Sequence, residues 1–226
     1  NIFTLGELVR IKYGKNQKKV QSENGTVPIY GTGGLMGYAT DVLYDKPSVL
    51  IGRKGTINKV RYVDHPFWTV DTLFYTEVNE ELVIPKYLYY LMSLLNLDSY
   101  NEGTTIPSLR TETLNRLEFD IPDIEYQEKV LSMLEPIDMK IKLNEKVNEN
   151  LQQQAVALFE SWFVNHDPWG GIQPSGWTNA PLGSFVEIKR GGSPRPIQDY
   201  LSDSGLRWLK ISDVTSLSSP FVLEIK

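Results

Sequence analysis

The chain has 226 residues, enough for one or two domains, and 41% of them are hydrophobic, which allows a sizeable buried core. It contains no cysteine, which excludes disulfides and cysteine-based zinc sites, and only two histidines, which excludes a histidine-rich metal site. The net charge of −5 excludes a uniformly basic nucleic-acid binder.

Residues 4–80 have the pattern of short strands separated by turns. Alternation of apolar and polar residues predicts strands at 8–12 and 59–63. Short apolar or β-branched runs predict strands at 27–30, 48–52 and 72–76. The glycine-rich stretch at 31–34 predicts a loop.

The next part of the chain predicts a helix, a loop and one more strand. Proline suits the first helical position, so Pro85 predicts a helix from Lys86 to about Leu97. Residues 101–108 are polar and contain Gly103 and Pro107, which predicts a loop. A further strand is expected within residues 114–121.

A long helix is predicted at 123–165, where Asp123 is a good N-cap. Pro136 interrupts it, so we expect two helices or one helix kinked near Pro136. Apolar residues and two asparagines then repeat at alternating spacings of four and three, as in a coiled-coil seam. The seam residues are Ile137, Ile141, Asn144, Asn148, Leu151, Ala155, Leu158 and Trp162. The seam favours a two-helix coiled coil, and the alternative is an amphipathic helix packed on its own domain.

An internal repeat follows the long helix. The segment LGELVRIKYG at residues 5–14 returns as LGSFVEIKRG at residues 182–191, with six of ten positions identical. The alternative is a chance match of two strand openings. We therefore expect a first domain at 1–122, the helix at 123–165, a linker at 166–179 and a partial second copy of the domain at 180–226.

Several segments in this order resemble the DNA-specificity subunit of bacterial type I restriction–modification systems. They are LGELVRIKYG at 5–14 with its repeat, PIYGTGG at 28–34, VLIGRKGTI at 49–57 followed by PFW at 66–68 and Asp71-Thr72, TTIPSL at 104–109, FDIP at 119–122, and EYQ at 125–127 leading into a helix that ends LFESWF at 158–163. Each segment alone is weakly specific, but their order covers nearly the whole chain.

The resemblance implies an α+β fold, with a strand-rich target recognition domain followed by a spacer helix. It also implies a non-catalytic role: the subunit binds one half of a split double-stranded DNA site. A partner methyltransferase (modification) subunit and, indirectly, a restriction motor subunit do the chemistry. Full-length members have two recognition domains, so this chain would restore the layout by homodimerising through its helix.

Candidate DNA-binding residues come mainly from the first 61 residues, which carry ten Lys and Arg against four acidic residues. Basic side chains position a protein on phosphates, and polar side chains on loops can read base edges. The candidates are Lys12, Lys15, Lys18, Lys19, Tyr30, Thr32, Arg53, Lys54, Asn58, Lys59, Arg61, Thr104, Thr105 and Ser108. The alternatives are lysines that merely solvate strand edges, a plain hairpin turn at 52–55, and a core role for Tyr30 and Trp68.

No catalytic site is expected. The glycine cluster at 31–34 lacks the lysine and spacing of a phosphate-binding loop, and Asp123 and Asp138 are too far apart along a helix to share a metal ion. We expect no cofactor, no metal, no membrane association and a cytoplasmic location. A second hypothesis is a structural coiled-coil adaptor whose β-rich domain binds protein or glycan.

Overall fold

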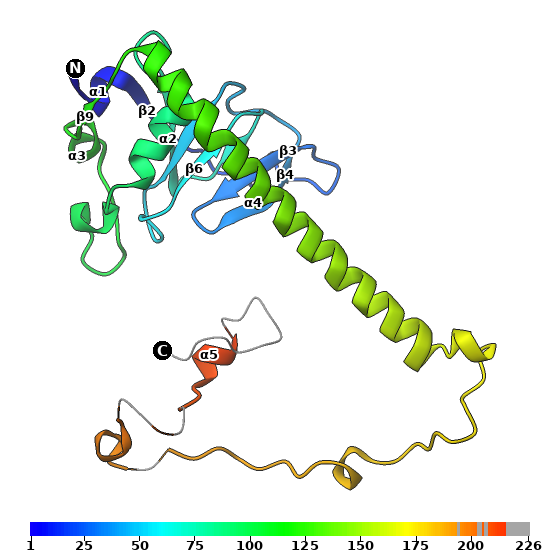
Figure 1. Ribbon diagram of the computed structural model, residues 1–226. Coiled ribbons are helices and arrows are strands. Elements are labelled where there is room, and N and C mark those ends of the chain that lie inside the picture. The colour runs from blue at the N-terminus through cyan, green and yellow to red at the C-terminus, as the bar shows by residue number, and fades with distance from the viewer. Residues whose placement is uncertain (194, 203–204, 206–207, 216–226) are drawn as a thin grey trace. The chain divides into compact units, whose positions relative to one another are not determined.

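The structure is a computed structural model that describes residues 1–193, 195–202, 205 and 208–215. The chain divides into two compact units, Asn1–Ala157 and Leu158–Lys226. All strands found in the described residues belong to the first unit (Figure 1). Among the described helices, none combines the length and the apolar character that a membrane span requires.

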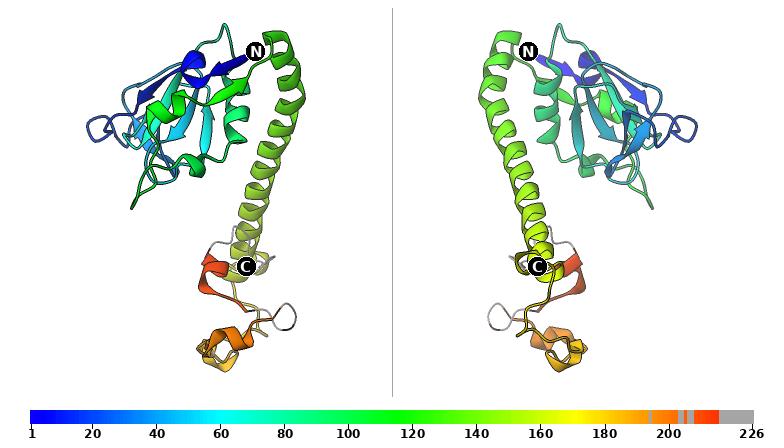
Figure 2. Two further views of the ribbon diagram at one scale, coloured as in Figure 1. Left: turned by 90° about the vertical axis from the view of Figure 1, so that its left-hand side faces the viewer. Right: turned by 90° about the vertical axis from the view of Figure 1, so that its right-hand side faces the viewer.

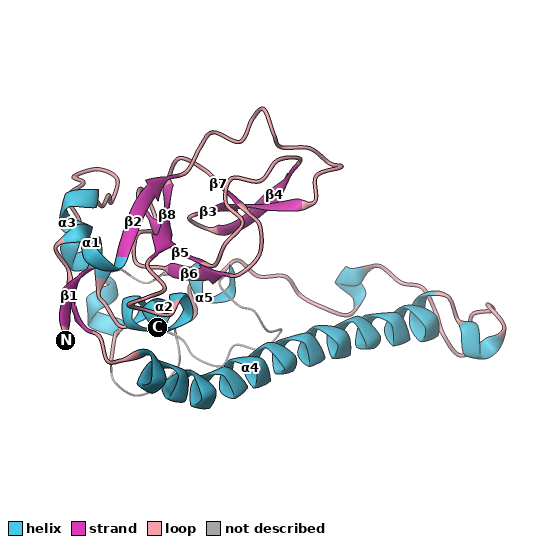
Figure 3. Ribbon diagram, turned by 90° about the horizontal axis from the view of Figure 1, so that it is seen from above, coloured by secondary structure: helices cyan, strands magenta, loops and turns pink. Residues whose placement is uncertain are grey.

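A four-stranded antiparallel sheet forms the centre of the first unit (Figure 3). Its order is β2 (Val9–Tyr13), β8 (Leu73–Val78), β5 (Ser48–Gly52) and β6 (Val60–Val63). β5 is buried along its whole length, as its apolar run predicts. The buried Ser48 hydroxyl donates to the Thr76 carbonyl at 2.8 Å and accepts from the Thr76 N–H at 2.9 Å, so its burial leaves no polar atom unsatisfied.

A second sheet has the order β4 (Gly34–Ala39), β3 (Val27–Gly31) and β7 (Trp68–Thr69). β3 pairs antiparallel with β4 and parallel with β7. Residues 31–34, expected as a loop, instead form the ends of β3 and β4 and the short turn between them. β4 itself has no clear strand pattern in the sequence, because Gly34 and Gly37 occupy it with φ angles of 126° and 155°.

A third sheet joins the N-terminus to the last strand of the first unit. β1 (Ile2–Thr4) pairs antiparallel with β9 (Glu118–Asp120). Between β1 and β2 lies the short helix α1 (Leu5–Leu8), so the strand predicted from residue 8 begins one residue later. The Thr4 N–H donates to Glu7 Oε2 at 2.7 Å, which starts this helical turn.

The helix α2 (Pro85–Ser93) packs on β5 and β6. It ends four residues earlier than expected, and a separate 3-10 turn forms at Leu97–Tyr100. A further short helix, α3 (Thr111–Asn115), precedes β9. The main core between these elements consists of Leu5, Leu8, Val9, Val49, Ile51, Ile57, Phe74, Val83, Leu88, Met92, Leu97, Leu109, Leu114, Leu117, Phe119 and Ile121. The mixture of sheets and helices confirms the expected α+β class.

The long helix α4 (Ile124–Phe159) runs through Pro136 as a single helix. We expected two helices or one helix kinked near Pro136; the structure has a single helix, and Figure 1 shows no sharp bend along it. Figure 2 shows that α4 extends beyond the part of the first unit that holds the strands, from which it starts. A π-helical turn, Glu160–Val164, follows it and contains the seam residue Trp162.

The second unit contains only short helical turns in its described residues. After the π-helical turn, these are the 3-10 turns Asp167–Trp169, Leu182–Ser184 and Ile197–Tyr200, and the helix α5 (Ile211–Thr215). The repeat at 182–191 forms no strand, whereas its counterpart in the first unit forms α1 and β2. Residues 216–226 of the expected second copy lie outside the described residues.

Candidate nucleic-acid interface

Two loops that are far apart in the sequence meet at the end of β5. The Leu109 N–H donates to the Arg53 carbonyl at 3.0 Å, and the Gly55 N–H donates to the Pro107 carbonyl at 2.9 Å. Lys54 and Ser108 form an isolated antiparallel bridge. The structure therefore brings together three predicted site residues, Arg53, Lys54 and Ser108, from two separate motifs.

Glycines allow each of these two loops to fold back closely on itself. A Cβ on Gly52 would lie 2.2 Å from the Thr56 carbonyl oxygen, and one on Gly103 would lie 1.9 Å from the Ile106 carbonyl oxygen. Neither position tolerates a side chain without movement of the backbone. A cavity of about 240 Å³ opens between the loops, lined by Tyr13, Arg53, Lys54, Ser108, Leu109, Arg110 and Glu112.

Arg53 is held in a defined orientation at this cavity. Its Nη1 donates to the Asp71 carbonyl at 2.9 Å, and its guanidinium carbon lies 5.2 Å from the centre of the Tyr13 ring. Tyr13 in turn packs edge-on against Phe74, with 5.0 Å between ring centres. A guanidinium fixed by one hydrogen bond and a cation–π contact keeps its other N–H groups available for an external acceptor.

The charge at this cavity suits an anionic ligand. In the part of the chain that the structure describes, neither Arg53 nor Lys54 forms an ion pair with an acidic residue. Arg110 is paired with Glu102, with 3.1 Å between Nε and Oε2. The two unpaired cations can therefore meet phosphate without first breaking an internal salt bridge.

The turn between β3 and β4 lies beside the same loops. A Cβ on Gly55 would lie 3.8 Å from Thr32 Oγ1, so Thr32 borders the Arg53 loop. A Cβ on Gly34 would lie 3.3 Å from Arg61 Nη2, so this glycine leaves room for the Arg61 side chain. Thr32 and Arg61 thus extend the polar surface from the cavity onto the second sheet.

Tyr30 contacts a residue that the sequence did not point to. Its hydroxyl lies 3.1 Å from His65 Nε2, and His65 Nδ1 lies 3.3 Å from Asp64 Oδ1. Burial raises the pKa of the Tyr30 hydroxyl, and the charge of the nearby Arg61 opposes that rise. Tyr30 is partly buried, so it combines a packing role with an accessible polar end.

Other candidates lie elsewhere or are already engaged. Lys12 pairs with Glu77, with 3.6 Å between Nζ and Oε2, and strand alternation points it to the opposite face of the sheet from Tyr13. Asn58 Nδ2 donates to Asp98 Oδ2 at 3.0 Å. Trp68 is 9% exposed and its Nε1 donates to the Lys15 carbonyl at 2.9 Å, which makes it a core residue. The remaining candidates are exposed without a defined partner in the cluster: Lys15, Lys18, Lys19, Lys59, Thr104 and Thr105.

Sequence reasoning missed Tyr13 and His65. Tyr13 is the last residue of β2, directly before Gly14, and nothing in this sequence pattern indicates a functional role. Its 52% exposure in the structure, unusual for a large aromatic side chain in a strand, is the feature that points to one. The contact of Tyr13 with Arg53 joins residues 40 positions apart, which no local pattern reports.

A second candidate surface is the predicted seam of α4. Ile137, Ile141, Leu151 and Leu158 are between 52% and 61% exposed, and Trp162 in the turn that follows is 48% exposed. The other seam positions, Asn144, Asn148 and Ala155, are exposed as well. A row of large apolar side chains left in water is characteristic of a surface that binds another protein.

Comparison with known protein families finds one family model that matches the first 153 residues. A family model described as the type I restriction modification DNA specificity domain matches residues 1–153, which cover the recognition domain and most of α4. The match includes both surfaces described above except for the distal end of the seam.

Curated relatives carry related descriptions. The chain is 24% identical over 202 residues to the type I restriction enzyme MjaIX specificity subunit of Methanocaldococcus jannaschii, covering 81% of this chain and 46% of that protein. It is 36% identical over 108 residues to the HindI specificity subunit of Haemophilus influenzae, covering 45% of this chain and 24% of the relative. The chain therefore spans less than half the length of these two relatives.

Solved structures share the fold. The S subunit of a type I restriction–modification system from M. genitalium matches with a TM-score of 0.62 and 18% identity, covering 73% of this chain and 46% of that one. The HsdS subunit from Thermoanaerobacter tengcongensis matches with a TM-score of 0.50 and 13% identity, covering 72% and 44%. At these identities the likeness concerns the fold alone.

Proposed function

The chain belongs to the type I restriction–modification DNA specificity family, and from this premise we propose that it directs a type I methyltransferase to one half of a bipartite DNA target. Its role is recognition, and the chemistry belongs to the partner subunits. The observation that carries the proposal is the convergence of Arg53, Lys54 and Ser108, from two separate loops, at one polar cavity. Thr32, from a third loop, borders the Arg53 loop beside it.

Within this interface, the basic and polar residues have different tasks. Arg53, Lys54 and Arg61 would contact phosphates, which positions the domain without selecting a sequence. Thr32 and Ser108, on neighbouring loops, would face base edges, because hydroxyl groups can donate to and accept from them. The exposed Lys15, Lys18 and Lys19 would extend the phosphate contacts beyond the cavity.

The α4 helix would serve as a spacer and as a pairing surface. Two copies of the exposed seam, joined antiparallel, would present two recognition domains to a split DNA site. The adaptor hypothesis shares this pairing surface, but no feature of the described residues favours a protein or glycan ligand over DNA.

The function is tested by a methylation map. The chain is co-expressed with its methyltransferase subunit, and modified adenines are located across the genome. A split palindromic motif is the expected result, because two copies of one recognition domain would read the same half-site twice. A split asymmetric motif would show that a different domain supplies the second half. The absence of any motif, with no co-purification of the methyltransferase, would contradict the proposal and favour the adaptor.

Helix pairing is tested separately from DNA recognition. Replacing Leu151 and Leu158 with Asp would bury four charges in the paired seam, so the dimer should dissociate. Light scattering should then give 25.8 kDa instead of about twice that mass. Val156→Asp is the matched control, because Val156 is 51% exposed but lies outside the seam. An unchanged mass in the double variant would contradict the pairing.

A further inference from the structure

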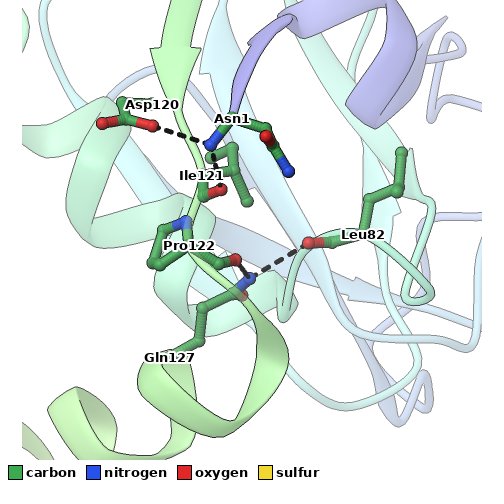
Figure 4. Close-up of polar contacts among 6 residues, drawn as sticks. All are labelled: Asn1, Leu82, Asp120, Ile121, Pro122 and Gln127. Atoms are coloured by element: carbon green, nitrogen blue, oxygen red, sulfur yellow. Dashed lines mark hydrogen bonds and ion pairs between the residues drawn. The ribbon is translucent and has the colours of Figure 1, made fainter.

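The attachment of α4 to the recognition domain is confined to its first four turns. Gln127 and Leu131 are the buried residues of this 36-residue helix. Gln127 Nε2 donates to the carbonyls of Leu82 at 3.0 Å and Pro122 at 2.9 Å (Figure 4). Its Oε1 accepts from the Ile84 N–H at 2.8 Å. A buried amide with all these partners fixes one point of the helix on the domain.

A second point of attachment lies about three turns further along. Lys86 Nζ is 3.2 Å from Glu135 Oε1 and 3.9 Å from Asp138 Oδ2. The Tyr90 hydroxyl donates to the Asp138 carboxylate. Burial and this hydrogen bond raise the pKa of Tyr90, so its hydroxyl remains a proton donor to Asp138 throughout the physiological range.

This second point brackets the proline of the helix. Pro136 has no N–H, so the helix loses one backbone hydrogen bond here, and such positions are where helices bend. Glu135 precedes the proline and Asp138 follows it, and both are held from α2 by Lys86 and Tyr90. The contacts therefore brace α4 at its weakest point.

The direction of α4 beyond Asp138 depends on this brace. The 21 residues that follow Asp138 as far as Phe159 span about 30 Å at ~1.5 Å each. A change of direction of about 10° at the proline would move the far end by about 5 Å, which exceeds the ~3.4 Å rise along the DNA axis from one base pair to the next. Without these contacts, the helix would therefore allow the distance between the two half-sites to vary by more than one base pair.

We propose that Lys86 and Tyr90 are positioning residues that hold Glu135 and Asp138 on either side of Pro136 and thereby fix the number of base pairs between the two half-sites. This inference rests on the proposed function for its effect on DNA. The brace itself is a property of the chain alone, so it can be tested without DNA.

The direct test measures the spread of helix directions. The chain contains no cysteine, so Glu118→Cys on β9 and Glu149→Cys on α4 give two unique sites for spin labels. Labelled protein is mixed with an excess of unlabelled protein, so that only labels in the same chain are measured. In Lys86→Met/Tyr90→Phe, the distance distribution should broaden. Lys129→Met/Tyr100→Phe, which makes the same chemical changes away from the brace, should leave it unchanged. An unchanged distribution in the brace variant would overturn the inference.

The functional test is the methylation map of the same variants. The brace variant should keep the parental half-site sequences, lose methylation at the parental spacing several-fold, and methylate sites one base pair shorter or longer. Tyr90→Phe alone, which removes one hydroxyl, should give a smaller shift in the same direction. Broadened distances with an unchanged single spacing would overturn the link to DNA while keeping the brace. A parental chain without any motif would instead count against the proposed function.

Discussion

The segments 5–14 and 182–191 share six of ten residues but have different structures. In the first segment, Leu5 and Leu8 are fully buried, and β2 pairs residue by residue with β8 from Val9–Val78 to Tyr13–Phe74. In the second segment, the corresponding Leu182 and Phe185 are 64% and 70% exposed, and no strand forms.

The difference shows that this motif is a strand only when distant partners are present. The Leu5 N–H donates to the Leu117 carbonyl at 2.7 Å, and the Asn79 N–H donates to the Leu8 carbonyl at 2.8 Å. In the described residues of the second unit, no strand is available to pair with residues 182–191. A strand without a hydrogen-bonding neighbour is not stable in water, so the alternating pattern alone does not produce β structure.

The largest expected effect, on the free energy of unfolding, comes from truncating the side chain at equivalent positions in the two copies. Leu8→Ala deletes a fully buried side chain and should lower the free energy of unfolding by about 2–5 kcal/mol. Phe185→Ala, at the equivalent position, removes an exposed ring and should change it by less than about 0.5 kcal/mol. Urea denaturation followed by far-UV circular dichroism measures both. Similar losses in the two variants would mean that the second copy is packed in solution.

A smaller effect is expected on DNA affinity. Arg53→Ala and Lys54→Ala should each weaken binding about tenfold, or about 1.4 kcal/mol, because each removes an unpaired cation from the cavity. Arg190→Ala removes an equal charge from the repeat at 182–191, which forms no strand, and should leave affinity unchanged. Fluorescence anisotropy with labelled duplex DNA, repeated over a range of salt concentrations, gives both the affinity and the number of phosphate contacts. Equal losses in all three variants would indicate general charge attraction rather than a defined interface.

The local sequence pattern predicted those elements that a run of neighbouring residues specifies by itself. The apolar run at 48–52 coincides with β5, and the glycine-free stretch after Asp123 contains α4. Elements that depend on distant residues were missed. β1 and β9 pair across more than 110 residues, and α1 contains Gly6, which disfavours a helix until Leu5 and Leu8 are buried.

The candidate site was predictable as a set of motifs, but not as a geometry. Arg53, Lys54 and Ser108 stand in recognisable segments, and the structure joins them through backbone hydrogen bonds between loops. Asn58 looked equally available, yet Asp98 accepts its amide hydrogen bond from 40 positions away. Side-chain pairings over such distances leave no local signal in one sequence.

The smallest expected effect comes from two lysines at equivalent positions. Lys12 forms an ion pair across two strands with Glu77, and Lys189 forms one with Glu187 two residues before it, at 3.6 and 3.0 Å. Lys12→Ala should lower the free energy of unfolding by less than about 0.5 kcal/mol, because both side chains are partly exposed and salt screens the pair. Lys189→Ala should have no measurable effect despite its shorter distance, because its ion pair connects residues in a segment without folded partners. Double-mutant cycles with Glu77→Ala and Glu187→Ala at two salt concentrations measure the coupling energy of each ion pair. Only a pair that joins two packed strands should contribute to the free energy of unfolding. A larger coupling energy for Lys189 would show that distance rather than folded context decides the contribution of an ion pair here.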